Sequence, residues 1–226
     1  MIQLAEPIPA LSHLLGAVVF LLLGVGLVRR GRAAPERFWS LAIYVVGVVA
    51  MLTASGLYHL AGPDHPWHAL LRRIYHAAIW LQIAGTFTPI HIIFFRGAWR
   101  RWPLVVVWTG ALLGVLLKLV FFELVSEGPG LALYLALGWS GAFSAFQLLR
   151  ERGWSMIAPV FKGGAFYSVG ALLEVSRLTP GLLTPHELFH FAVLGGVAWH
   201  WLFIHRAAGW DWVPPRQTPV VVPVTV

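Results

Sequence analysis

Seven long apolar runs, separated by short polar connections, dominate the pattern of hydrophobic and polar positions along the chain. Each run holds about 20 residues, the length that an α-helix needs to cross the hydrocarbon core of a membrane. The runs lie near residues 9–28, 39–61, 73–95, 103–122, 131–149, 156–174 and 186–206. The connections between them leave no room for a soluble domain. We therefore expect an all-α integral membrane bundle of seven transmembrane helices over residues 1–206.

The chain carries too little charge to cover a water-facing surface. Of its 226 residues, 58% are hydrophobic and only 11% are charged, whereas soluble domains have about 25% charged residues. A multi-pass protein of the cell membrane is therefore expected. Its partners are then membrane lipids and no nucleic acid, because the net charge of +7 comes mostly from arginines at the ends of apolar runs. Residues 207–226 are rich in proline and are predicted to form an irregular tail.

Arginines are divided unequally between the two sides of the predicted bundle. The side that carries the C-terminus has eleven, and the side that carries the N-terminus has three, at positions 72, 73 and 177. The positive-inside rule therefore places the N-terminus outside and the C-terminus in the cytoplasm. The same alternation puts the end of the second run and the starts of the third and seventh runs on one side of the membrane.

Three histidines are predicted to meet on that side. His186 and His190 are four residues apart at the start of the seventh run, so a helix would place both imidazoles on one face, as a transition metal requires. His59 ends the second run and is expected at a similar depth. Because the chain has no cysteine, a site here would use imidazoles alone, and three imidazoles with an open position suit zinc. Three separately hydrogen-bonded interfacial histidines are the alternative.

The same stretch also matches the H-E-x-x-H pattern, in which Glu187 would act as the general base of a zinc protease. A protease of this kind needs a third ligand downstream. The candidates are His200, His205 and Asp211, and none of them has a familiar spacing. An intramembrane metalloprotease is therefore kept only as an alternative hypothesis.

Other ionisable residues lie inside the apolar runs, where they are costly and call for a partner. His200 lies about 15 Å deeper than the paired histidines and is expected to hydrogen-bond elsewhere. His13 and Lys118 are expected to be isolated from the cluster. The side chain of Lys118 is expected either to extend to the membrane interface or to pair with a carboxylate such as Glu123 or Glu174.

Three motifs together resemble the hemolysin III family, which belongs with the adiponectin and progestin receptors in a seven-helix superfamily. They are Ala-Ser-Gly-Leu-Tyr-His at residues 54–59, Ile-Ala-Gly-Thr-Phe-Thr-Pro at residues 83–89, and the histidine pair of the seventh run with His200 beyond it. The resemblance covers nearly the whole chain. It implies a seven-helix fold, a Zn²⁺ ion as cofactor, and metal-dependent hydrolysis of lipid amides by a zinc-activated water.

On this sequence the zinc ligands implied by the resemblance are His59, His186 and His190, the same three that the spacing brings together. The resemblance also implies that Ser55, one helical turn before His59, lies beside the site as a hydrogen-bonding neighbour. A lipid amide would be the substrate. The superfamily implies a cytoplasmic N-terminus, opposite to the arginine count, so the orientation is left open, as is the oligomeric state.

The chain departs from the family at the start of the third run. The family has an Asp there, in a Leu-Asp-His context, whereas this chain has Tyr75 between Ile74 and His76. A phenol is not anionic at neutral pH, so Tyr75 or Glu187 becomes the candidate for proton transfer in a hydrolase. The alternative is a non-catalytic membrane sensor or homeostasis protein in which zinc is structural.

Overall fold

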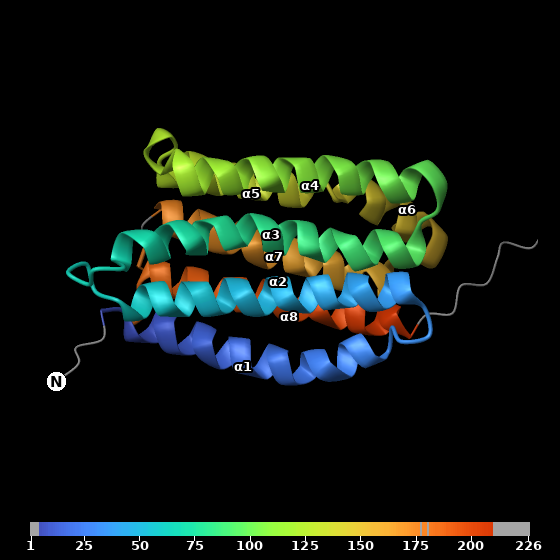
Figure 1. Cartoon of the computed structure of the whole chain (residues 1–226), viewed down its shortest axis with the longest axis horizontal. Helices are drawn as coiled ribbons and strands as arrows, with labels where there is room; N and C mark the ends of the chain where they lie inside the picture. Colours follow the sequence, from blue (N-terminus) through green and yellow to red (C-terminus); the bar gives the residue numbers. More distant parts are fainter. Residues whose placement is uncertain (1–4, 177, 180, 210–226) are drawn as a thin grey trace, which may run out of the picture.

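The chain folds into a bundle of long helices that run side by side (Figure 1). The computed structural model describes residues 5–176, 178–179 and 181–209. Its elements in chain order are α1 (Pro7–Arg29), α2 (Pro35–Leu60), α3 (His68–Phe94), α4 (Gly97–Val120), the 3₁₀ turn η1 (Phe122–Leu124), α5 (Glu127–Trp139), α6 (Ala142–Arg152), α7 (Trp154–Ser176) and α8 (Pro185–Ala208).

Within these described residues, seven spans are long and apolar enough to cross a membrane. The prediction of an all-α bundle of seven transmembrane helices is confirmed, and the protein is a multi-pass integral membrane protein. The helix α8 continues to Ala208, two residues beyond the expected boundary. The proline-rich tail was predicted for residues 207–226, and positions 210–226 lie outside the described residues.

Prolines and glycines mark where the helices begin and how they are joined. Pro7, Pro35 and Pro185 each stand at the first position of a helix, where the missing N–H would have no partner inside the helix. Gly97 and Gly153 have φ angles of 58° and 77°, a left-handed conformation that glycine adopts without strain. These two residues make the tight turns that start α4 and separate α6 from α7.

The fifth predicted run forms a membrane span as expected, but its helix is interrupted. Helix α5 ends at Trp139 and α6 begins at Ala142, and the two together form the fifth span. At the break the Ser140 hydroxyl donates to the carbonyl of Leu137 (2.6 Å). A Cβ atom on Gly141 would lie 2.9 Å from the ring of Phe87 on α3. The close approach of α3 therefore favours glycine at this turn.

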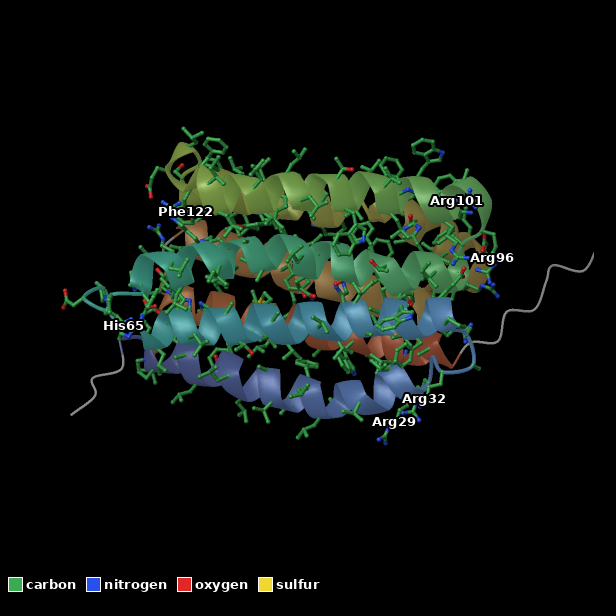
Figure 2. The ribbon with its side chains drawn as sticks, in the orientation of Figure 1. Arg29, Arg32, His65, Arg96, Arg101 and Phe122 are labelled. Carbon is green, nitrogen blue, oxygen red and sulfur yellow. The ribbon has the colours of Figure 1, made fainter. Side chains whose placement is uncertain are left out.

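The last helix, α8, packs against helices from the first half of the chain. Helices α1, α2, α3 and α4 pack in sequence, α7 packs along α8, and α8 also contacts α1, α2 and α3. In Figure 1 helix α1 forms the lower edge of the bundle and α4 and α5 the upper edge. The arginines labelled in Figure 2 gather at one end, and His65 lies at the other. The end of α2 lies at the same end of the bundle as His65, and so do the starts of α1, α3 and α8 (Figure 1).

Candidate metal centre

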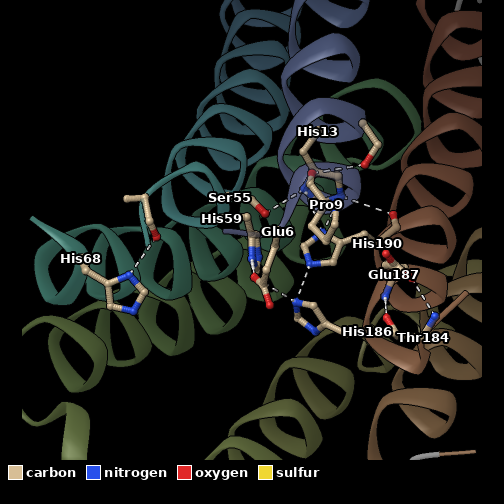
Figure 3. A network of polar contacts seen from close by, with 12 residues as sticks. Glu6, Pro9, His13, Ser55, His59, His68, Thr184, His186, Glu187 and His190 are labelled. Atoms are coloured by element: carbon tan, nitrogen blue, oxygen red, sulfur yellow. Dashed lines mark hydrogen bonds and ion pairs between the residues drawn. The ribbon is translucent and has the colours of Figure 1, made fainter. Parts of the chain in front are cut away.

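Three histidines from two helices converge at the end of the bundle opposite the arginines. His59 closes α2, and His186 and His190 lie in the first turns of α8. One ring nitrogen from each lies within 4.8 Å of the others, and the Nε2 atoms of His186 and His190 are 3.2 Å apart. His59 and His190 are buried, whereas the side chain of His186 is 34% exposed. The structure therefore brings together the three residues that spacing singled out (Figure 3).

The ring of His59 is fixed by Glu6, the residue that precedes α1. Its Nδ1–H donates to the Glu6 carboxylate, and the Glu6 backbone N–H donates to the carbonyl of His59 (3.2 Å). The hydrogen bond from His59 holds the pKa of the Glu6 carboxyl below its usual value. On the other side of the ring, the Nε2 atom of His59 is buried without a hydrogen-bond partner. A buried polar atom without a partner is costly, so a ligand is expected there.

The ring of His186 is fixed by Glu174 near the end of α7. The Nδ1–H of His186 donates to Oε1 of Glu174 (3.1 Å). Glu174 had been considered as a partner for Lys118. The ammonium group of Lys118 donates a hydrogen bond to the carbonyl of Val125 (3.2 Å) and lies 4.8 Å from the centre of the Phe122 ring.

The ring of His190 is fixed by His13 of α1. The Nδ1 atom of His190 lies 3.1 Å from Nε2 of His13, and Nδ1 of His13 lies 2.8 Å from the hydroxyl of Ser55. It was therefore wrong to expect His13 to be isolated: it is fully buried against the cluster. The contact observed for Ser55 is with His13, which separates it from the three converging rings.

The three rings share one arrangement that suits a metal ion. Each presents Nδ1 to an outer partner, and the partners are Glu6, Glu174 and His13. Histidines that bind metals through Nε2 donate their other N–H to a carboxylate or a similar group in the same way. Tetrahedral zinc with bonds of about 2.0–2.1 Å holds its nitrogens about 3.3 Å apart, close to the 3.2 Å observed in the α8 pair. The donor set and the orphaned Nε2 of His59 thus fit zinc.

Sequence reasoning missed Glu6 and did not predict the contacts of Glu174 and His13 with the cluster. A signal for Glu6 was present, because it is the acidic residue immediately before the first apolar run and lies on the predicted side of the cluster. The partners of Glu174 and His13 depend on which helices are neighbours. That information is absent from the spacing within each helix.

Glu187 and Tyr75, the residues considered for proton transfer, have different surroundings. The carboxylate of Glu187 accepts from the backbone N–H of Thr184 (2.7 Å), whose hydroxyl accepts from the N–H of Glu187 (3.2 Å). This reciprocal pair is a capping box at the start of α8. Tyr75 is buried, and its ring centre lies 5.8 Å from that of His59.

His200 lies away from the cluster, as expected. The Nε2–H of His200 donates to the carbonyl of Val160 on α7 (3.2 Å). A Cβ atom on Gly163 would lie 2.4 Å from the His200 ring, so α7 and α8 approach each other closely there. His200 is therefore a packing residue between these two helices.

A cavity of about 430 Å³ extends from the histidine cluster into the bundle. Its polar end is lined by Glu6, His59, Glu174 and His186. The residues that continue the lining are mostly apolar and include Ile83, Phe87, Ile90, Leu148 and Phe203. The metal candidate thus lies at one end of a mostly apolar space.

The fold and the site together define a seven-span helical membrane protein with a histidine cluster at one end. A family model described as haemolysin-III related matches residues 2–201. Hemolysin-3 of Bacillus cereus is 29% identical over 197 residues, which cover 84% of this chain and 85% of that protein. A hemolysin-3 homolog of Bacillus subtilis (strain 168) is 31% identical over 162 residues, covering 70% and 72%. The chain belongs to the hemolysin III family.

Proposed function

We propose that this protein is a zinc-dependent membrane hydrolase of lipid amides, with His59, His186 and His190 as the zinc ligands. The observation that carries the proposal is the shared orientation of these three rings. Each has its Nδ1 atom held by an outer partner, and the Nε2 atom of His59 is buried without one. Rings held only for hydrogen bonding would not leave that atom orphaned.

The charges around the cluster suit a divalent ion at the edge of a membrane. Two carboxylates, Glu6 and Glu174, contact the histidines, so three neutral imidazoles and two anionic neighbours would balance an ion of charge +2. When bound, zinc supplies a Lewis acid that lowers the pKa of a coordinated water to about 7. The carboxylates keep the Nδ1–H tautomer of their histidines, which leaves Nε2 as the donor atom.

The cavity supports a lipid as the substrate. Along α3 its lining runs from Tyr75 to His91, a helical length of about 24 Å at 1.5 Å per residue. Most of the lining side chains are apolar, as ligand pockets for hydrocarbon require. A single long acyl chain would fit such a space with its amide group at the polar end, beside His59 and His186.

A second candidate function is a membrane sensor in which zinc is structural. The observation that favours it is Tyr75, whose phenol stands where the family resemblance implies an Asp. A buried phenol of this kind is a poor base at neutral pH. One carboxylate oxygen of Glu187, Oε2, meanwhile accepts a hydrogen bond from Thr184 in the capping box of α8.

The test is hydrolysis of lipid amides by the purified full-length protein in detergent micelles, with release of free fatty acid measured by mass spectrometry. We expect release by the wild type and none by His186→Ala. Ala145→Leu, which narrows the cavity, should shift the preference toward shorter acyl chains, whereas Val106→Leu on an exposed face of α4 should not. Bound zinc with no turnover of any lipid amide would favour the sensor.

A further inference from the structure

Helix α1 supplies no candidate ligand, yet one residue just before it and one residue within it contact the histidine cluster. Glu6 immediately precedes α1, and His13 lies seven residues later, two helical turns away on the same face. Helix α1 packs against both α2 and α8, the two helices that carry the converging rings. Figure 3 shows Glu6 beside His59 and His13 beside His190.

Glu6 ties the start of α1 to the ring of His59 in two ways. The carboxylate accepts from Nδ1–H of His59, and the backbone N–H donates to the carbonyl of the same residue. The carboxylate oxygen Oε2 also lies 3.9 Å from Nε2 of His186. Both the rotation and the tautomer of His59 are therefore fixed from α1.

His13 contacts the ring of His190 from within the bundle and holds it in position. The Nε2 atom of His13 lies 3.1 Å from Nδ1 of His190 and 3.3 Å from the carbonyl oxygen of His190, and Nδ1 of His13 lies 2.8 Å from the hydroxyl of Ser55. These contacts fix the orientations of both rings and leave Nε2 of His190 facing His186. His13 and His190 are each fully buried, so water does not compete for these contacts.

We propose that α1 is the positioning helix of the metal centre, in which Glu6 and His13 hold ligands that belong to two other helices. The inference rests on the proposed zinc site and deepens it. Removing an outer partner of a metal-binding histidine lowers metal affinity about 10- to 100-fold, because the ring must then be ordered when the ion binds. The two residues are positioning residues and do not coordinate the ion.

The experiment uses the full-length protein in detergent micelles and Co²⁺ as the probe. Affinity is measured by chelator competition, and ligand geometry by the visible absorption of bound Co²⁺. Glu6→Ala and His13→Ala should each bind about 10- to 100-fold more weakly with an altered spectrum. Glu6→Gln, which keeps a hydrogen-bond acceptor for His59, should recover part of the loss.

Two control variants separate positioning from general damage. Ser12→Ala lies beside His13 but removes only a hydrogen bond to the carbonyl of Pro9, and Asp64→Ala removes an exposed loop carboxylate at the same end of the bundle. Both should bind Co²⁺ as the wild type does. The unfolding temperature of each metal-free variant is measured in parallel, and His13→Gln replaces His13→Ala if the latter does not fold.

The outcomes separate this inference from the proposed function. Wild-type affinity and spectrum in Glu6→Ala and in the folded His13 variant, with binding abolished in His186→Ala, would overturn the role of α1 and leave the metal centre standing. Loss of binding in Glu6→Ala as complete as in His186→Ala would make Glu6 a ligand and overturn positioning. A wild-type protein that binds no Co²⁺ or Zn²⁺ would overturn the metal centre itself, and this inference with it.

Discussion

The Nδ1 atom of His186 lies 3.1 Å from Oε1 of Glu174, and this contact joins α8 to the end of α7. Both side chains are about one-third exposed, at 34% and 31%. His186 is thus the most open of the three converging histidines, and Glu174 fixes its ring from a helix that supplies no candidate ligand. The proposed metal centre draws its candidate ligands from α2 and α8, and α7 and the start of α1 contact these ligands from the outer side.

Glu174→Ala should lower zinc affinity about 10- to 100-fold, because His186 loses the carboxylate that fixes its ring. Chelator competition on the purified protein measures the change. Glu123→Ala removes an exposed carboxylate of η1 and should leave the affinity unchanged. Equal affinity in Glu174→Ala and in the wild type would mean that this contact does not support the metal centre.

Glu187→Ala should destabilise the protein without changing its zinc content. The substitution removes the capping box at the start of α8, and lost caps cost about 0.5–2 kcal/mol. Glu187→Gln preserves the capping pattern and should unfold at the wild-type temperature. A Glu187→Gln variant that keeps its zinc and its stability but loses lipid hydrolysis would instead assign Glu187 a proton-transfer role.

His200→Leu should keep its zinc, because His200 donates to the carbonyl of Val160 and lies about 15 Å along α8 from His190. Elemental analysis of the purified variant measures this, and the unfolding temperature shows the cost of the lost hydrogen bond. Zinc lost from a variant that still folds would revive the metalloprotease hypothesis, which requires a third ligand downstream of the histidine pair.

Gly114→Ala should destabilise the packing of α4 on α3. A Cβ atom there would lie 2.1 Å from the ring of Trp80, and overpacking of this kind costs about 1–3 kcal/mol. Gly26→Ala is the matched control, because a Cβ atom there meets nothing within 4 Å. Thermal unfolding in detergent measures both variants, and equal unfolding temperatures would contradict this account of the α3–α4 contact.

The sequence pattern was sufficient to predict the transmembrane spans, because each apolar run is long enough to cross the membrane by itself. It also brought His59 together with His186 and His190, since spacing along α8 and alternation of sides place all three at one end. The break between α5 and α6 was not predictable in this way. The glycine at this turn reflects a contact with Phe87, which approaches Gly141 from another helix.

The outer partners were harder to predict for a related reason. Whether His13 contacts His190 depends on α1 packing against α8, and helices that are apolar all round do not reveal their neighbours through periodicity. Glu174 and Glu123 were considered as partners of Lys118 on charge alone, whereas the packing of α7 along α8 places Glu174 against His186.

The most direct test of the metal centre is the zinc content of the purified wild type beside the double variant His186→Ala/His190→Ala. His65→Ala/His205→Ala, which removes two histidines outside the cluster, is the matched control. We predict about one zinc ion per chain in the wild type and in the control, and none in the double variant. No zinc in the wild type, or equal zinc in all three proteins, would contradict the assignment of His59, His186 and His190 as a metal centre.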